Sequence, residues 1–263
     1  MTDRIAARPL SESTVLIVGG TSGVGLASAL KFAEHGVVNL AVVGRDVVRG
    51  ERAVALLKAR FPTARVTYIA ADANIAKEAV RVVAATQKAF GRVDALVNST
   101  VGPYPPVLLH RMPIDDIEPT LRQQIMAPLL MSRAVLPAMR EVGGGVILNV
   151  SSDAGKLATP GESVIGAAMA GIIMFSRTLA IEAKRDGIRV NCLTPSLIEG
   201  TLTNQRMMRD EFTSKLLDKA RQAARLGVCS ADDLAEMIVF LASPAASRVT
   251  GQAISVNGGI SAA

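Results

Sequence analysis

Three glycines form the clearest chemical pattern in this chain of 263 residues. Gly19, Gly23 and Gly25 follow a β-branched run at residues 14–18 and open an apolar segment with helical spacing at residues 26–34. Glycines between a strand and a helix let backbone N–H groups approach a pyrophosphate at the helix N-terminus. We therefore expect this turn to hold a dinucleotide. A glycine-rich turn without a ligand is the alternative.

The elements that must position this turn alternate along the chain. Short apolar runs predict strands, and segments with helical spacing separate them. The predicted strands cover residues 14–18, 40–43, 65–70, 95–98, 146–150, 189–193 and 253–256. The predicted helices cover residues 26–34, 50–59, 75–90, 163–183 and 231–242, together with a long segment that ends at residue 140. From Pro195 we expect an irregular stretch, which is charged over residues 201–225.

Apolar strands separated by helices are typical of a parallel sheet covered on both faces. The alternation fits a doubly wound open sheet and also a closed eight-stranded barrel. The glycine turn in the first strand–helix unit favours the open sheet. We therefore predict an α/β fold with a doubly wound parallel sheet (Rossmann fold), about seven strands and helices on both faces, in one domain over residues 1–263.

The composition excludes several classes of protein. Hydrophobic residues make up 49% of the chain and charged residues 20%, which argues against disorder. The net charge of +6 comes from scattered Lys and Arg, so no nucleic-acid partner is expected. The longest uncharged apolar stretch, residues 164–176, is shorter than the ~20 residues of a membrane-spanning helix, so no membrane partner is expected either.

The two cysteines and the N-terminal residues indicate the compartment. Cys192 and Cys229 are too few for a disulfide framework, and their spacing matches no metal site. We expect both to be reduced, and no bound metal. Residues 1–13 mix acidic and basic side chains without an apolar core, so neither a secretory signal nor a transit peptide is indicated. A cytoplasmic location is expected.

The glycine turn and later motifs resemble those of the short-chain dehydrogenase/reductase family. Residues 18–25 read Val-Gly-Gly-Thr-Ser-Gly-Val-Gly, close to the family's Thr-Gly-x-x-x-Gly-x-Gly. Over residues 12–260 further matches follow in family order: Asp72, Asn98, residues 134–139, 149–152 and 187–191, Pro195, Ile198 and residues 250–259. The resemblance implies a Rossmann fold, an NAD(P)-dependent redox activity and a small-molecule substrate.

The end of the second strand bears on the choice of nucleotide. An acidic residue there accepts a hydrogen bond from the adenosine ribose and repels a 2′-phosphate. This chain has Gly44 followed by Arg45, and a guanidinium suits a phosphate. We therefore expect NADP, with NAD as the alternative if Arg45 is only a solvated charge. By the resemblance, the nucleotide contacts are Gly19, Thr21, Ser22, Gly23, Val24, Gly25, Arg45, Asp72, Ala73, Asn98, Thr100 and Ile198.

The resemblance fails at the residues that perform the family's chemistry. The family uses a Ser, a Tyr thirteen residues later and a Lys four beyond it, with an Asn in the preceding long helix. Ser152 fits the first role, but Ile165 and Met169 replace the Tyr and the Lys, and Gln124 replaces the Asn. Neither Ile nor Met can exchange a proton with a substrate oxygen. Pro195-Ser196 also replaces the family's usual Pro-Gly.

Few other side chains can supply a proton. Tyr104, between prolines in the loop after the fourth strand, is the first substitute, although such a Tyr is more often a packing anchor. Ser152 can still donate a hydrogen bond to a substrate oxygen. We expect Asp153 and Lys156 to be solvated loop charges and His110 to have a surface or capping role.

Three functions fit this pattern. The first is an atypical NADPH-dependent reductase of an enone or enoyl thioester, in a pocket made apolar by Ile165 and Met169. The second is a catalytically inactive nucleotide-binding subunit or sensor, and the third and weakest is a non-redox lyase or hydratase. The resemblance also implies a homo-oligomer, typically a tetramer, or an assembly with an active sibling. The small residues at 166–173 can pack against a partner helix there, although packing against the chain's own sheet explains much of this pattern.

Overall fold

The computed structural model of the chain describes residues 8–263. Within them seven parallel strands form one open sheet in the order β3-β2-β1-β4-β5-β6-β7. This confirms the predicted doubly wound sheet and excludes a closed barrel. The prediction that residues 1–13 are no targeting segment lies largely outside the described residues. The strands are β1 (Thr14–Val18), β2 (Asn39–Gly44), β3 (Arg65–Ala70), β4 (Ala95–Asn98), β5 (Gly145–Val150), β6 (Ile188–Thr194) and β7 (Ala253–Ser255).

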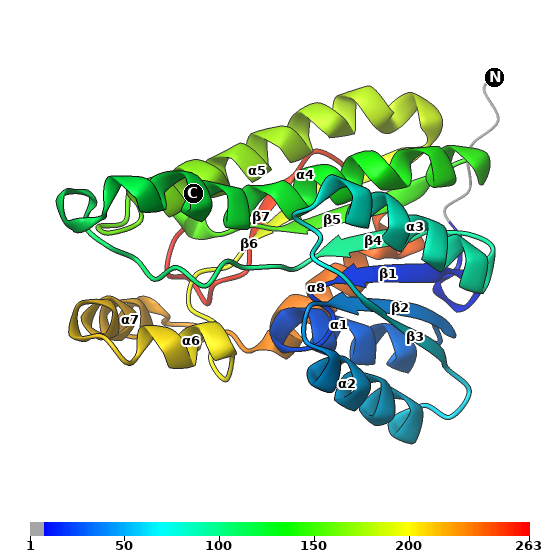
Figure 1. The fold of residues 1–263 in the computed structure, drawn as a ribbon, viewed down its shortest axis with the longest axis horizontal. Helices are drawn as coiled ribbons and strands as arrows, with labels where there is room; N and C mark the ends of the chain where they lie inside the picture. Colours follow the sequence, from blue (N-terminus) through cyan, green and yellow to red (C-terminus); the bar gives the residue numbers. More distant parts are fainter. Residues whose placement is uncertain (1–7) are drawn as a thin grey trace.

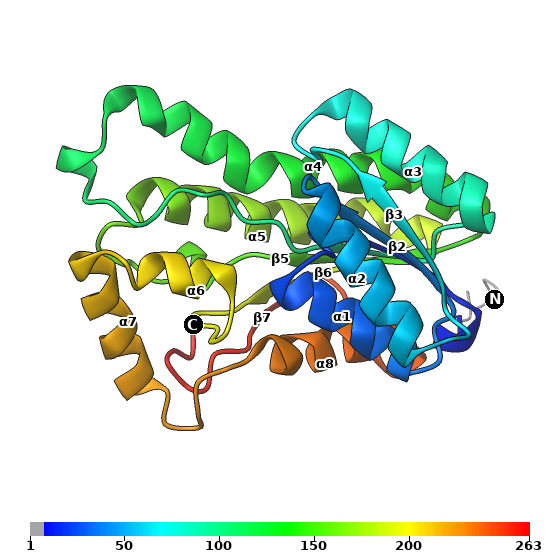
Figure 2. The same ribbon diagram turned by 60° about the horizontal axis from the view of Figure 1, so that its bottom comes forward.

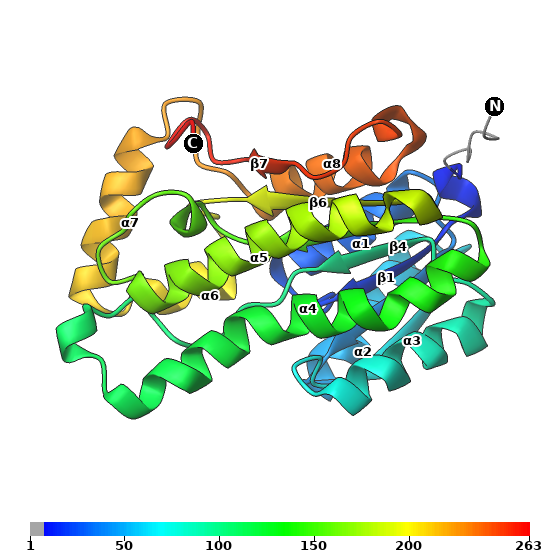
Figure 3. The ribbon, with the colours of Figure 1, turned by 90° about the horizontal axis from the view of Figure 1, so that it is seen from above.

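Helices cover both faces of this sheet (Figure 1). One face carries α3 (Ala76–Phe90), α4 (Ile117–Glu141) and α5 (Ser163–Ala183), seen in front of the sheet in Figure 3. The other face carries α1 (Gly23–Glu34), α2 (Val47–Arg60) and α8 (Ala231–Ala242). Each layer has its own apolar core, with Val82, Met131 and Leu179 in the first and Phe32 and Ile238 in the second.

Local signals set the ends of the helices. The Asp46 carboxylate accepts a hydrogen bond from the Arg49 backbone at 3.0 Å, so α2 begins at Val47, three residues before the predicted start. Ser230 and Asp233 form a reciprocal capping box at the start of α8. Gly91, with a φ of 81°, ends α3 in the left-handed conformation.

The region between Pro195 and residue 225 is helical, which corrects the expectation of an irregular segment. It forms α6 (Leu202–Met207) and α7 (Glu211–Ala223), which lie together at one end of the molecule (Figure 2). Thr201 and Asp210 cap them by accepting hydrogen bonds from the backbones of Asn204 and Thr213. The two helices bury few residues, namely Asn204 in α6 and Thr213 and Leu217 in α7, and the charged composition of the segment therefore misled the prediction.

Helix α5 is a core helix. Ser163–Asp186 is long and apolar enough to pass a test for a membrane-crossing helix, yet half of its most apolar window is buried in the fold. Its small residues pack within the chain, because a Cβ on Gly166 would lie 2.8 Å from the Ala154 backbone oxygen and one on Gly171 would lie 2.8 Å from Ile125 of α4. These two glycines therefore serve intrachain packing, which was one of the two roles expected of them.

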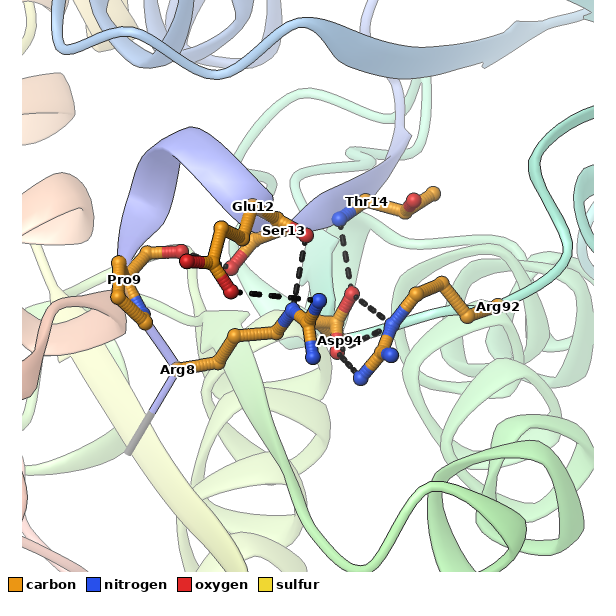
Figure 4. A network of polar contacts seen from close by, with 7 residues as sticks. All are labelled: Arg8, Pro9, Glu12, Ser13, Thr14, Arg92 and Asp94. Atoms are coloured by element: carbon orange, nitrogen blue, oxygen red, sulfur yellow. Dashed lines mark hydrogen bonds and ion pairs between the residues drawn. The ribbon is translucent and has the colours of Figure 1, made fainter. Parts of the chain in front are cut away.

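At the N-terminal end of the sheet, polar contacts fasten β1 to β4 (Figure 4). The buried Asp94 carboxylate accepts a hydrogen bond from the Thr14 backbone at 2.9 Å and from Arg92 Nε at 2.8 Å. Arg8 pairs with Glu12 at 3.4 Å in the turn before β1. The Asp94 carboxylate thus ties the start of β1 to the start of β4.

The two cysteines are buried and unpaired, as expected for reduced residues. Cys192 lies in β6 and is fully buried. Removal from water raises the pKa of its thiol to about 12, because burial disfavours the thiolate. Neither cysteine therefore has the character of a reactive thiolate.

Candidate active site

A cleft opens at the C-terminal ends of the strands. β1 pairs with β2 on one side and β4 on the other, so the chain leaves β1 and β4 toward opposite faces of the sheet. In open α/β sheets ligands bind at such a switch point. The cleft has a volume of about 580 Å³ and lies between this edge and the helices α6 and α7.

The glycine turn after β1 forms one wall as a cradle of backbone. Gly19 has a φ of 82°, and a Cβ there would lie 2.4 Å from the Ser99 backbone oxygen. Gly25 lies behind the turn, where a Cβ would lie 2.3 Å from the Gly19 oxygen. Ser22 precedes α1 but makes no side-chain hydrogen bond to its first turn. The N–H groups of that turn thus have no side-chain cap and suit an anion such as pyrophosphate.

The ends of β2 and β3 form a basic corner of the cleft. A Cβ on Gly44 would lie 2.8 Å from the Thr21 hydroxyl oxygen, so a larger side chain there must displace Thr21. The half-exposed guanidinium of Arg45 lies 3.9 Å from an Asp72 carboxylate oxygen. Arg49 lines the same corner and pairs with Asp46 at 3.1 Å. Arg49 was not predicted; its place one turn of α2 beyond Arg45 is the signal that reveals it.

The loop after β3 holds the expected adenine-side residues. Asp72 accepts hydrogen bonds from the backbone and the side-chain amide of Asn74, at 3.0 and 2.9 Å. Asn74 in turn accepts from the backbone of Ala127 at 3.1 Å, in the turn of α4 that contains Pro128. The loop is thereby fixed to α4, with Asp72 and Ala73 on the wall of the cleft.

The two predicted residues at the end of β4 differ in whether their side chains reach the cleft. Thr100 lines the cleft, and its buried hydroxyl has no hydrogen-bond partner among the described residues. An orphaned buried hydroxyl at the wall fits a ligand with its own donors and acceptors, such as a ribose. Asn98 is instead fully buried and donates to Asn149 at 2.8 Å, so its side chain joins β4 to β5 beneath the wall.

The other end of the cleft carries the residues aligned with the family's catalytic set. Ser152, Ile165 and Met169 all line it, the last two as buried side chains on one face of α5. The Ser152 hydroxyl accepts from the Ala154 backbone at 3.2 Å. The wall at this end is therefore hydrocarbon and thioether, with one hydroxyl beside it.

Gln124 has a structural role beside this wall. It is buried in α4, and its amide oxygen accepts a hydrogen bond from the Gly102 backbone at 3.1 Å. It thereby holds the start of the loop that carries Tyr104. Tyr104 lines the cleft and is half-buried.

An acidic residue that the sequence interpretation missed also lines this end. Glu162 is the N-cap residue of α5, and its side chain borders the cleft with Thr159 and Ile165. Burial raises the pKa of its carboxyl above the ordinary value, and a hydrogen bond from Thr159 opposes that rise only in part. Its position three residues before Ile165 was the available signal.

Asp153 and Lys156 are not solvated charges, which corrects the sequence interpretation. The buried Asp153 accepts hydrogen bonds from Asn257 at 2.6 Å and from Ser261 at 2.9 Å. The Lys156 ammonium donates to the backbone oxygens of Ala253 and Ala263 and to the Ser255 hydroxyl, at 2.9, 2.8 and 3.0 Å. Both charges hold the C-terminal segment in place. His110 is exposed in a short turn, as expected.

Helices α6 and α7 close the cleft opposite the sheet. Asn204, Arg206 and Lys219 line it from this side, and a buried side-chain oxygen of Asn204 has no hydrogen-bond partner among residues 8–263. The half-buried Ile198, expected near the nicotinamide, lines the cleft before α6 and is joined to Cys229 by an isolated bridge. In the described part of the chain no cluster of three metal-ligating side chains occurs. The uncapped α1 turn, the basic corner and the orphaned hydroxyl of Thr100 together fit a dinucleotide.

Comparisons with known proteins agree with this geometry. A family model described as Enoyl-(Acyl carrier protein) reductase matches residues 18–261. The chain is 33% identical over 252 residues to Dehydrogenase/reductase SDR family member 4 of Pongo abelii, covering 95% of this chain and 88% of that protein. It is 31% identical over 258 residues to 3-oxoacyl-(acyl-carrier-protein) reductase of Thermotoga maritima, covering 95% of this chain and 98% of that protein.

A similar solved structure has a nucleotide bound. It is a short chain oxidoreductase from Pseudomonas aeruginosa PAO1, solved with NADPH and described as containing an atypical catalytic center. Its TM-score to this chain is 0.87 at 27% sequence identity, and the match covers 96% of this chain and 98% of that chain.

Proposed function

Because this chain belongs to the short-chain dehydrogenase/reductase family of NAD(P)-binding oxidoreductases, we propose that it is an NADPH-dependent reductase of an enone or enoyl thioester. The observation that carries the proposal is the division of its cleft. The nucleotide end keeps an uncapped helix and a basic corner, whereas Ile165 and Met169 fill the wall where the family places its Tyr and Lys.

The basic corner supports NADPH over NADH. Gly44 supplies no carboxylate that would repel a 2′-phosphate, and its contact with Thr21 leaves little room for one. Arg45 and Arg49 offer two guanidinium groups to the same corner. Planar guanidinium groups bind phosphate through paired hydrogen bonds, so the third phosphate of NADPH gains contacts that NADH lacks.

The apolar wall supports a conjugated substrate. When bound, the nicotinamide supplies a hydride. A conjugated double bond accepts hydride at the carbon remote from the carbonyl, so the carbonyl oxygen needs only a hydrogen bond as its negative charge develops. Ser152 is placed to donate that bond, while Ile165 and Met169 exclude water from the site. A simple ketone needs a proton at its oxygen, which the side chains of Ile165 and Met169 cannot provide.

The apolar side chains at positions 165 and 169 also support a second function, nucleotide binding without turnover. Met169 replaces a Lys that in the family holds the nicotinamide ribose, so the chain has lost a cofactor contact as well as a proton donor. The deciding experiment titrates the protein with NADPH by fluorescence and then follows the loss of nicotinamide absorbance with panels of enones, enoyl thioesters and ketones. Turnover of conjugated substrates alone supports the reductase. Binding without any turnover supports the inactive subunit.

Homo-oligomer formation, or assembly with an active sibling subunit, belongs to the same proposal. On α5, Met174 and Ile181 are exposed by 58% and 62%, which leaves apolar area on the outer face of a core helix. Burial of such area is a common basis of symmetric assembly. Light scattering with size-exclusion chromatography measures the oligomeric state.

A further inference from the structure

Glu162 is a cleft residue for which the family resemblance provides no role. It caps the N-terminus of α5 three residues before Ile165. Side chains three apart on a helix share a face, and Glu162, Ile165 and Met169 all line the cleft. The carboxyl group is therefore about one helical turn from the place where the family holds its proton-donating Tyr.

Helix α7 and the loop after β4 cover the turn that carries Glu162; we call the helices α6 and α7 the lid. A Cβ on Gly161 would lie 2.7 Å from the Phe212 ring of α7 and 3.3 Å from Pro106, so lid, loop and turn are in close contact. The Val107 backbone donates to the Gly161 oxygen at 2.8 Å, which fastens the loop that carries Tyr104 to this turn. These contacts shield one side of Glu162 from water.

No cation neutralises Glu162 within the described residues. None of the ion pairs found there involves it. A shielded carboxyl without a cation favours its protonated form. The other titratable and charged side chains that line the cleft are Tyr104 from the loop after β4, Asp153 from the turn after β5, Arg206 from α6, Lys219 from α7, and Arg45, Arg49 and Asp72 at the nucleotide end.

We propose that Glu162 is the proton donor of the reduction in this cleft, an inference that rests on the proposed function. The substrate carbon accepts a hydride from the reduced nicotinamide, which is thereby oxidised. The O–H bond of the Glu162 carboxyl breaks, and its proton bonds to the enolate that the hydride creates. The Glu162 carboxylate then regains a proton from solvent, so the substrate gains two hydrogen atoms in total.

Tyr104 is the competing donor, and its setting is less suited to the role. It lies in a loop between the exposed Pro103 and Pro105, outside any helix or strand. Glu162 directly precedes the helix that builds the apolar wall, and its backbone N–H donates to the Thr159 carbonyl oxygen at 3.1 Å, which fixes the backbone from which its side chain extends. Proton transfer depends on such fixed placement.

The first test is turnover of a conjugated substrate by Glu162→Gln, which keeps the size of the side chain and removes the acid. We expect kcat to fall about 10²- to 10⁴-fold, the usual contribution of a positioned acid, with unchanged NADPH affinity. Glu182→Gln, at an exposed site on the same helix, is the matched control and should retain full turnover. Tyr104→Phe should lose less than about tenfold. Retained turnover in Glu162→Gln, with a large loss in Tyr104→Phe, overturns the proposal.

The second test adds a spectroscopic readout to the measurement of turnover. Infrared difference spectra of the wild type minus Glu162→Gln, recorded across a pH series, report the protonated carboxyl of this one residue. We expect the signal to persist above the ordinary Glu pKa of ~4.3, and kcat to decline as the pH rises through the same midpoint, because only the protonated form donates. An ordinary midpoint overturns the proposal. Absence of NADPH binding to the wild type refutes the proposed function instead, which keeps the two failures distinct.

Discussion

The two ends of the cleft differ in what their side chains can do. At the nucleotide end, the N–H groups of α1 have no side-chain cap, the Thr100 hydroxyl is orphaned, and Arg45 and Arg49 line the wall while pairing with Asp72 and Asp46. At the reaction end, Ile165 and Met169 are packed with Ile172 and Cys192 in an apolar cluster. The side chains suited to nucleotide binding and those at the reaction end thus lie in separate parts of the cleft, so the two can be altered independently.

The largest expected effect comes from restoring the family's residues at the reaction end. The double variant Ile165→Tyr with Met169→Lys should gain simple ketone reduction by about 10²-fold or more, because a phenol and an ammonium then face the substrate. The control is Ile165→Phe with Met169→Lys, which has the ring without the hydroxyl. Consumption of NADPH with a ketone is the measurement. Equal rates in the two variants would show that the cleft has diverged beyond these two positions.

At the nucleotide end, Gly19→Ala should impair binding through the backbone. The new Cβ would lie 2.4 Å from the Ser99 backbone oxygen, so it must displace the segment after β4 that carries Thr100. Overpacking of this kind costs about 1–3 kcal/mol, and we expect NADPH affinity to fall by about tenfold to a hundredfold. Fluorescence titration measures the affinity.

Gly143→Ala is the matched control for that backbone effect. Gly143 has a φ of 76°, similar to that of Gly19, but a Cβ there meets nothing within 4 Å. It should cost some stability through the left-handed backbone and leave NADPH affinity unchanged. Equal losses of affinity in both variants would attribute the effect to general destabilisation, and the phosphate cradle would lose its support.

The sequence predicted some elements of the fold and missed others. The parallel sheet and the glycine turn were predictable because buried strands and tight turns leave local patterns, as at Thr14–Val18 and Gly19. The helices α6 and α7 were missed because they bury few side chains.

The sequence predicted site residues only where a single residue contributes its own backbone conformation or its own charge, without a distant partner. Arg49 and Glu162 reach the cleft through the geometry of their helices, and their spacing from Arg45 and Ile165 was the one signal of this in the sequence. Lys156 and Asp153 find their partners about a hundred residues away in the C-terminal segment. Such pairings arise from tertiary structure and leave no trace in local sequence.

Lys156 links the C-terminal segment to the reaction end, where Ile260 lines the cleft. Lys156→Met should lower the free energy of unfolding by about 2 kcal/mol, because three acceptors lose a charged donor. Denaturant unfolding measures the change, with the exposed Lys58→Met as control. NADPH affinity should stay near the wild-type value, since the nucleotide end is separate. A large loss of affinity would mean that the two ends are coupled.

The smallest expected effect is the one that decides the nucleotide. Arg45→Gln removes a cation whose side chain is 57% exposed, so solvent screening limits its contribution. We expect NADPH affinity to fall by about tenfold, equivalent to about 1.4 kcal/mol, with NADH affinity unchanged. Arg52→Gln, exposed on α2 and outside the cleft, is the control for net charge. Equal losses for both nucleotides would place Arg45 on a shared part of the ligand, and the preference for NADPH would then rest on Arg49 alone.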